Sequence, residues 1–228
     1  MDPLIQLKQR TPIFFVALLL ACFAIRQSAH AVVPAPDGGY PGFNTAEGQN
    51  ALFSLTTGVA NTGVGWYSLF SNTDGSFNTA LGAGTLLFNV GDQSTGEGVQ
   101  NTAVGGAALL FNTTGFENTA VGATALLNNT TGSSNTAVGN EALSSNTTAD
   151  FITATGFQAL HNNTTGPANT ATGAFALNNL TTGASNAAIG NNALANSTDG
   201  ASNTAIGASA LIFLSVGNGN IALGTGAG

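Results

Sequence analysis

A five-residue motif, Asn-Thr-Ala-Val-Gly or a close variant, recurs along most of the chain and sets the order of its polar and apolar positions. Successive copies begin 17 residues apart, except for one interval of 23 residues. A short, fixed period is typical of a solenoid, in which each repeat forms one coil that packs on the next. We therefore predict about eleven stacked coils over residues 44–228, with six extra residues near 90–95 and an incomplete last unit. The copies begin at Asn44, Asn61, Asn78, Asn101, Asn118, Asn135, Ile152, Asn169, Asn186, Asn203 and Asn220.

Two register positions, counted from the first residue of each copy as position 0, keep one residue type throughout. Position 4 is always Gly, and position 8 is Leu in every complete unit. Disordered low-complexity sequence has no physical reason to hold Leu in register, so we expect a folded chain. The constant Gly indicates a backbone angle or a close approach that a Cβ atom would block. The glycines are Gly48, Gly65, Gly82, Gly105, Gly122, Gly139, Gly156, Gly173, Gly190, Gly207 and Gly224; the leucines are Leu52, Leu69, Leu86, Leu109, Leu126, Leu143, Leu160, Leu177, Leu194 and Leu211.

Each unit reads as a strand, a second arm and a turn. Positions 1 to 4 alternate in polarity and end in Gly, which predicts a short β-strand. Ala at position 2 then points to one side, and Thr at position 1 and Val, Ile or Leu at position 3 point to the other. Positions 11 to 14 read Asn-Thr-Thr-Gly or a close variant, which is turn chemistry. The second arm fits another short strand, which we favour, or a single helical turn. The predicted fold class is an all-β parallel β-solenoid.

Stacking turns every register position into a row of equivalent side chains. The Leu row and the Ala row are predicted to fill a thin interior, with coils about 4.8 Å apart. Each buried Leu contributes about 1.5–3 kcal/mol, whereas ordering each residue costs about 1.5 kcal/mol, so one coil cannot stand alone. The Asn row at position 0 is predicted to hydrogen-bond along the stack. Ile152 interrupts that row, and we expect a weak point there.

The row at position 3 is apolar although it points away from the thin interior. A continuous exposed apolar stripe usually marks an interface, so we expect chains to associate along this row as a symmetric homo-oligomer. Thr155 and Thr172 interrupt the stripe. The alternative is a monomer in which a flatter coil covers the row with its second arm. The predicted interface residues are Val64, Leu81, Val104, Val121, Val138, Ile189 and Ile206.

The repeat resembles a known family. Its NTA-[VIL]-G core, complete at 101–105, 118–122, 135–139 and 203–207, is similar to the head repeats of trimeric autotransporter adhesins, the YadA-like head. The resemblance covers about residues 44–228 and implies a trimeric, left-handed parallel β-roll on a bacterial surface fibre. The 17-residue unit is longer than the usual head repeat, so the second arm is the part expected to differ.

The first residues have the pattern of an export signal. Lys8 and Arg10 precede an apolar run over residues 13–25, which is shorter than the roughly 20 residues of a membrane span. Ala29-His30-Ala31 is a small-x-small site, so we predict a signal peptide over 1–31. An uncleaved membrane anchor and a lipoprotein anchored at Cys22 are the two alternatives. Residues 32–43 hold three of the six prolines and no repeat, and we predict an N-terminal cap or tether there.

Charged residues are scarce, at 6% of the chain, and the net charge is −7. All three basic residues, Lys8, Arg10 and Arg26, lie in the predicted signal peptide. A chain without Lys or Arg cannot neutralise phosphates, which argues against nucleic-acid binding. The single Cys also lies in the signal, so the processed chain is expected to have no disulfide.

The remaining inventory offers little catalytic chemistry. The processed chain would keep one His, His161, and nine carboxylates at scattered register positions. We expect His161 to occupy a variable outer position, and we expect no enzyme activity, no cofactor and no metal site. Trp66 and Tyr67 are adjacent and fit an exposed or cap-packing aromatic pair, with a glycan contact as the alternative.

Eight Asn-x-Ser/Thr sequons occur, and we interpret them as by-products of the repeated turn sequence in a bacterial exported protein. They begin at Asn112, Asn128, Asn129, Asn146, Asn162, Asn163, Asn179 and Asn196.

Two functions fit this pattern. The first is an adhesin-like fibre, on the outer membrane or secreted, that presents rows of Asn and Thr for multivalent adhesion to a host or abiotic surface. The alternative is an ice- or crystal-surface-binding solenoid that uses its regular Thr rows at positions 1 and 12. Those rows are Thr45, Thr62, Thr79, Thr102, Thr119 and Thr136, and Thr113, Thr130, Thr147, Thr164, Thr181 and Thr198.

Overall fold

The computed structural model describes residues 40–228, which all belong to one compact unit. The predicted signal peptide (1–31) and residues 32–39 of the predicted cap lie outside the described residues. Within 40–228 the chain forms strands and turns, and it contains no helix long and apolar enough to cross a membrane.

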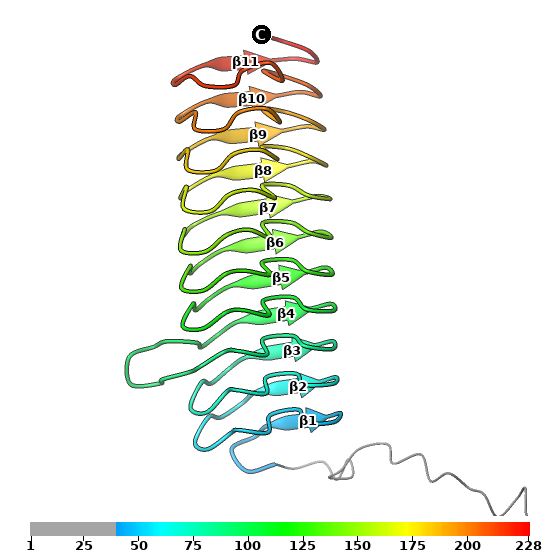
Figure 1. Ribbon diagram of the computed structural model, residues 1–228, viewed down its shortest axis with the longest axis vertical. Coiled ribbons are helices and arrows are strands. Elements are labelled where there is room, and N and C mark those ends of the chain that lie inside the picture. Colours follow the sequence, from blue (N-terminus) through cyan, green and yellow to red (C-terminus); the bar gives the residue numbers. More distant parts are fainter. Residues whose placement is uncertain (1–39) are drawn as a thin grey trace, which may run out of the picture. The chain divides into compact units, whose positions relative to one another are not determined.

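Eleven three-residue strands stack into one parallel sheet, one strand for each coil (Figure 1). Every strand pairs with the next along the chain, and equivalent register positions face each other, as in the pairing of Thr119 with Thr136. The predicted parallel β-solenoid is confirmed. The strands are β1 (Thr45–Glu47), β2 (Thr62–Val64), β3 (Thr79–Leu81), β4 (Thr102–Val104), β5 (Thr119–Val121), β6 (Thr136–Val138), β7 (Thr153–Thr155), β8 (Thr170–Thr172), β9 (Ala187–Ile189), β10 (Thr204–Ile206) and β11 (Ile221–Leu223).

The strand is short because the Gly at position 4 ends it at a sharp corner. Gly122 has a φ of +136°, a backbone conformation that L side chains rarely adopt. A Cβ atom on it would lie only 2.4 Å from the carbonyl oxygen of Gly139 in the next coil. The corner therefore needs Gly for its backbone angle and also for the close approach of the coil above.

The second arm is neither the second strand nor the helical turn expected from the sequence. It is a run of turns in which non-Gly residues at positions 6 and 8 have positive φ, as at Thr124 (55°) and Leu126 (51°). These angles let Ala125 and Leu126, which are consecutive, both point into the interior. Neighbouring residues of a strand would point to opposite faces. Backbone hydrogen bonds still join the coils here, for example from Leu126 N to Ala142 O at 3.0 Å.

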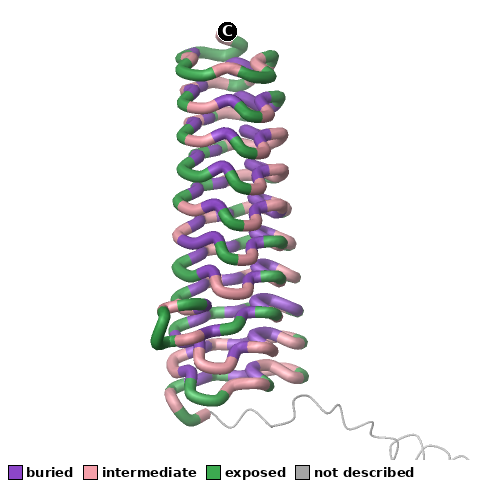
Figure 2. The backbone as a smooth tube through the Cα atoms, turned by 60° about the vertical axis from the view of Figure 1, so that its left-hand side comes forward, coloured by how far each residue is buried: buried purple, intermediate pink, exposed green. Residues whose placement is uncertain are grey.

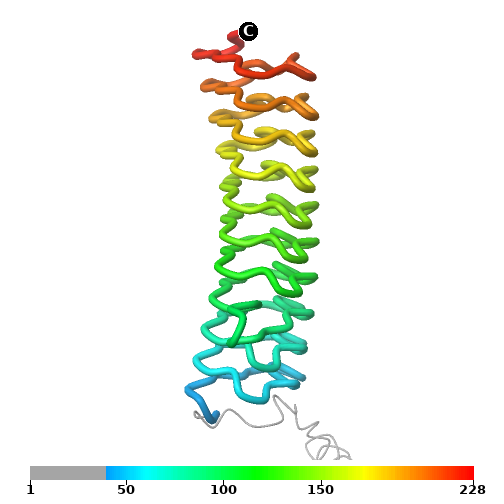
Figure 3. Tube along the Cα trace, turned by 90° about the vertical axis from the view of Figure 1, so that its left-hand side faces the viewer, coloured from blue at the N-terminus to red at the C-terminus, as the bar shows by residue number. Residues whose placement is uncertain are grey.

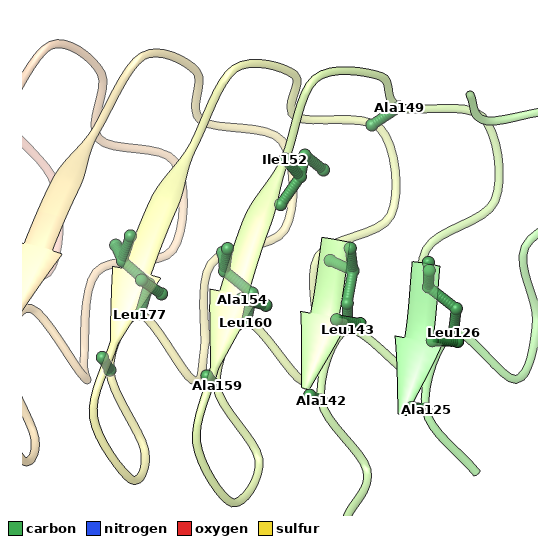
Figure 4. Packing of buried hydrophobic residues seen from close by; sticks show 14 of the residues in the cluster. Ala125, Leu126, Ala142, Leu143, Ala149, Ile152, Ala154, Ala159, Leu160 and Leu177 are labelled. Atoms are coloured by element: carbon green, nitrogen blue, oxygen red, sulfur yellow. The ribbon is translucent and has the colours of Figure 1, made fainter. Parts of the chain in front are cut away.

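The predicted interior is confirmed. Leucines of successive coils lie in one row, with Leu126, Leu143, Leu160 and Leu177 side by side in Figure 4. The alanines at positions 2 and 7 pack against them. Buried positions recur at the same places in every coil (Figure 2), so the core is a narrow strip along the whole stack.

The predicted Asn row at position 0 forms a continuous ladder through most of the stack. Oδ1 of Asn101 accepts hydrogen bonds from the backbone N–H of Asn118 at 3.0 Å and from its Nδ2 at 3.2 Å. Nδ2 of Asn118 also donates to the carbonyl of Gly132 at 2.8 Å. At the break, the N–H of Ile152 still donates to Asn135, but its side chain offers no acceptor to the N–H of Asn169.

A second Asn ladder, at position 11, was not predicted. The side chain of Asn129 donates to Oδ1 of Asn112 and to the carbonyl of Gly132, both at 2.8 Å. The ladder runs from Asn72 to Asn163 and ends at Leu180, where Oδ1 of Asn163 is left without a hydrogen-bond partner. The Asn-Thr-Thr-Gly segment is thus a turn whose first residue also belongs to the core.

The extra residues form a small hairpin between β3 and β4, visible at one corner of the column (Figures 1 and 3). Asp92 and Glu97 pair across it. Coil stacking continues past the loop, because Asn101 N still donates to Oδ1 of Asn78 at 3.0 Å. At the first coil, Tyr40 pairs with Asn44, and Asn44 donates to Pro41 O at 2.7 Å.

Candidate functional site

The outer face of the eleven-stranded sheet, called the sheet face below, carries the side chains of positions 1 and 3. The Ala at position 2 of each strand is buried, and its two neighbours point outward. The row at position 3 is partly open to solvent, with Val121 37% exposed and Ile189 43% exposed. All seven predicted interface residues lie in this row: Val64, Leu81, Val104, Val121, Val138, Ile189 and Ile206.

The sheet face has almost no charge. Among the strand residues at positions 1 and 3, only Glu47 in β1 is ionisable. Within residues 40–228, no hydrogen bond to protein occupies the Thr hydroxyls at position 1, for example those of Thr119 and Thr136. The face is therefore a regular array of free hydroxyl groups beside a row of branched apolar side chains.

The Thr row at position 12 is different, because its hydroxyl groups are used inside the protein. Oγ1 of Thr113 donates to Thr130 O at 2.8 Å, and Oγ1 of Thr130 donates to Thr147 O at 2.9 Å. The same bond recurs from Thr147, Thr164 and Thr181. These hydroxyl groups tie the coils together, so of the two Thr rows only the one at position 1 presents free donors.

The Asn side chains of the motif and of the turn are also internal. Asn118 belongs to the ladder at position 0 and Asn129 to the ladder at position 11, and both are fully buried. The expected display of Asn rows at these positions is therefore wrong, because each amide is needed for the ladder. The exposed amides lie elsewhere, for example at Asn140 and Asn191.

The eight Asn-x-Ser/Thr sequons differ in how far their Asn is buried. Four of them begin at buried ladder residues, and the other four begin one residue earlier in the repeat, where Asn128 and Asn196 are exposed. The buried group consists of Asn112, Asn129, Asn146 and Asn163.

Two ionisable side chains, those of His161 and Glu141, lie close together on one side of the solenoid. His161 Nε2 lies 3.5 Å from Oε2 of Glu141, and the pair borders a shallow open depression with Asn128 and Ser145. Within residues 40–228 no three His, Cys, Asp or Glu side chains come together as metal ligands. His161 is half-buried on the outside of its coil, in the position expected for it.

The turn carboxylates are held by hydroxyl groups. Oδ1 of Asp199 accepts hydrogen bonds from Thr181 at 2.9 Å and from Thr182 at 3.0 Å, and these bonds lower its pKa. Asp74 has the same environment, because the hydroxyl groups of Thr56 and Thr57 lower its pKa in the same way. Both carboxylates fasten one coil to the coil before it.

Comparison with known proteins adds no assignment: no family model, curated protein or solved structure matches the chain.

Proposed function

We propose that the protein is a non-enzymatic, exported rod of the adhesin type, assembled as a homo-oligomer through its sheet face. The observation that carries the proposal is the exposed row at position 3, which is apolar from β2 to β6 and from β9 to β11, on a face that is nearly free of charge. A row of this kind in a water-exposed position favours burial against a partner. The resemblance to YadA-like heads makes a trimer the expected assembly.

The distribution of charge supports a second copy as the occupant. The chain carries a net charge of −7, so two copies repel each other wherever their acidic surfaces meet. The acidic groups Asp74, Glu117 and Asp199 belong to the turn that precedes each strand rather than to the strands themselves. Contact through the sheet face is therefore the arrangement that opposes the fewest like charges.

This arrangement decides which surfaces remain for adhesion. The free Thr hydroxyls share the sheet face with the apolar row, so an oligomer formed there covers both. Adhesive contacts then fall to the second arm and the turns, which repeat at every coil. Several weak contacts along one rigid rod, multiplied by the number of chains, give affinity through avidity.

Ice or crystal-surface binding is the second candidate, and the free hydroxyls at position 1 are the observation that favours it. They stand in a straight row on a flat sheet, with neighbours about 4.8 Å apart. This function needs the sheet face open to solvent, whereas the oligomer covers it. The two proposals therefore compete for one surface.

The mass of the purified chain in solution tests the first proposal. Light scattering after size-exclusion chromatography is expected to give three chains per particle. Introducing charge by the double substitution Val121→Lys and Val138→Lys is expected to yield monomers with an unchanged circular dichroism spectrum. Thr131→Lys, at an exposed turn position of the same region, is the matched control and should leave the mass unchanged.

A monomeric wild-type chain would contradict the oligomer. A thermal-hysteresis and ice-shaping measurement on that monomer then tests the second candidate. Thr136→Tyr on the sheet face should abolish any such effect, and Thr131→Tyr on the turn should preserve it.

A further inference from the structure

Four aromatic side chains form one cluster on the first two coils. The ring centroids of Trp66 and Tyr67 lie 4.3 Å apart, those of Tyr67 and Phe70 4.8 Å apart, and those of Phe53 and Phe70 5.3 Å apart. Trp66 is 54% exposed and Phe53 68% exposed. The cluster lies beyond the Gly corner that ends β1 and β2, so it belongs to the second arm and not to the sheet face.

Coil stacking explains only half of this cluster. Phe53 and Phe70 occupy the same register position in successive coils and stack with their planes 9° apart. Phe88 and Phe111 make the same kind of contact at 5.5 Å and 5°, so stacked Phe pairs are a structural device that the chain uses twice. Stacking between coils does not explain Trp66 and Tyr67, because these two residues are neighbours in one coil.

The coils on either side leave Trp66 and Tyr67 uncovered. At the same two positions, the coil below carries Gln49 and Asn50, and the coil above carries Ala83 and Gly84. No aromatic side chain therefore stacks on either ring from a neighbouring coil. The equivalent positions of the coil below carry amide side chains, and those of the coil above carry nothing larger than a methyl group.

The backbone conformation at Tyr67 is common to the repeat and does not set this residue apart. Its φ is +55°, in the left-handed region that bulky residues avoid and that Asn and Gly tolerate. Asn50 and Asn192 occupy the same position in other coils, but so do Thr124, Gln158 and Phe175, and all five have a positive φ. What sets this coil apart is the pair of rings itself, because Trp66 is 54% exposed and is followed directly by a second aromatic residue.

We propose that this cluster is a carbohydrate-binding platform for the apolar face of a hexose within a neutral polysaccharide. Exposed aromatic rings supply a large, rigid contact area for the C–H face of a sugar. The amides of Gln49 and Asn50 supply donors and acceptors for its hydroxyl groups. Two carboxylates flank the cluster along the chain: Glu47 points out of the sheet face, and Asp74 accepts hydrogen bonds from Thr56 and Thr57 in the turn.

Other flat ligands fit less well. Nucleic acid bases also stack on aromatic rings, but their phosphates would meet a chain of net charge −7 with no basic residue after Arg26. The proposed carbohydrate-binding platform rests on the adhesive function proposed above. It does not depend on the oligomer, because the sheet face and the cluster are separate surfaces.

The fluorescence of Trp66 provides a direct test, since it is the only Trp of the chain. We would titrate the full chain with cellohexaose, chitohexaose and mannohexaose and follow the emission. At least one sugar should give a saturable shift. The variant Phe53→Ala keeps the fluorophore and removes one exposed ring, and its affinity should fall about tenfold. Phe77→Ala is the matched control, because Phe77 is 56% exposed and lies just before β3, whereas the cluster follows the Gly corners that end β1 and β2.

A second measurement does not need the fluorophore. We would run the chain in a native gel that contains the polysaccharide built from the sugar that shifts the fluorescence. This polysaccharide should retard the wild-type chain and Phe77→Ala but not Trp66→Ala. The proposal is overturned if none of the three sugars shifts the emission of Trp66. It is also overturned if Phe77→Ala loses as much sugar binding as the variants of the cluster. A fall of the oligomer mass in Trp66→Ala also overturns it, because the cluster is then a chain–chain contact. Loss of sugar binding with an intact trimer, by contrast, leaves the proposed assembly standing.

Discussion

The side-chain amide of Asn129 donates a hydrogen bond to Oδ1 of Asn112 across 2.8 Å, in the interior of two successive coils. The same amide donates to the carbonyl of Gly132, which also accepts from Asn118. The two Asn ladders therefore meet at one backbone carbonyl in each of the coils that have both, namely at Gly75, Gly98, Gly115, Gly132 and Ala149. This shared acceptor links the strand to the turn.

Removing one member of the ladder should destabilise the column. Asn129→Ala leaves Oδ1 of Asn112 and one donor of Asn146 without a partner inside the core, and each orphaned group costs about 1–3 kcal/mol. We expect the free energy of unfolding to fall by about 2–4 kcal/mol in urea titrations. Asn128→Ala, at the exposed neighbouring position, should change it far less. Equal effects for both substitutions would show that the ladder contributes little.

Restoring the interrupted ladder should have the opposite effect. Ile152→Asn places an acceptor beside the N–H of Asn169 and a donor beside Asn135, and we expect a gain of about 1 kcal/mol in unfolding free energy. Ile152→Ala is the control, because it removes the apolar side chain without supplying an acceptor and should destabilise the protein. If Ile152→Asn also destabilises the protein, the packing of Ile152 outweighs the missing hydrogen bond.

Two glycine positions should respond differently to alanine. Gly122→Ala combines a φ of +136° with a contact at 2.4 Å to backbone, and it should cost about 3 kcal/mol or more. Gly132→Ala should cost less, because Ala149 already occupies the equivalent position of the next coil. A Cβ atom on Gly132 would also approach a backbone carbonyl, that of Ala149 at 2.5 Å, but Gly132 does not have the positive φ of Gly122. Thermal melts of the two variants rank the costs, and a reversed order would contradict this account of the corner.

Stability should fall in acid because of the turn carboxylates. The hydroxyl groups of Thr181 and Thr182 hold the pKa of Asp199 below its ordinary value of 3.8. A carboxylate with a depressed folded-state pKa contributes stability above its unfolded pKa, and the contribution is lost as pH falls through the folded value. We expect Asp199→Asn to lower the melting temperature at pH 7 and to have no effect near pH 2. A constant difference across this range would show that protonation is not the cause.

The sequence predicts the coil because its strongest signals are register signals. The positions of Leu126, Ala120 and Gly122 in the repeat determine which row is buried and where the strand ends. The second arm was predicted wrongly because residues such as Thr124 and Leu126 adopt left-handed angles that their types do not indicate.

The second ladder was missed for another reason. Asn in an Asn-Thr-Thr-Gly segment is also the expected residue of an exposed turn. One signal was available: Leu180 replaces Asn at that register position, and a position that accepts both Asn and Leu is more consistent with burial than with an exposed turn. The sheet face, in contrast, followed directly from the alternation of the strand.

The hairpin that carries Asp92 and Glu97 shows how one corner of the column absorbs added chain. The coils on either side keep their contacts, so the extra residues leave the stacking unchanged. This corner is therefore a natural grafting point, where a foreign epitope or a label could be carried at a defined height on the rod.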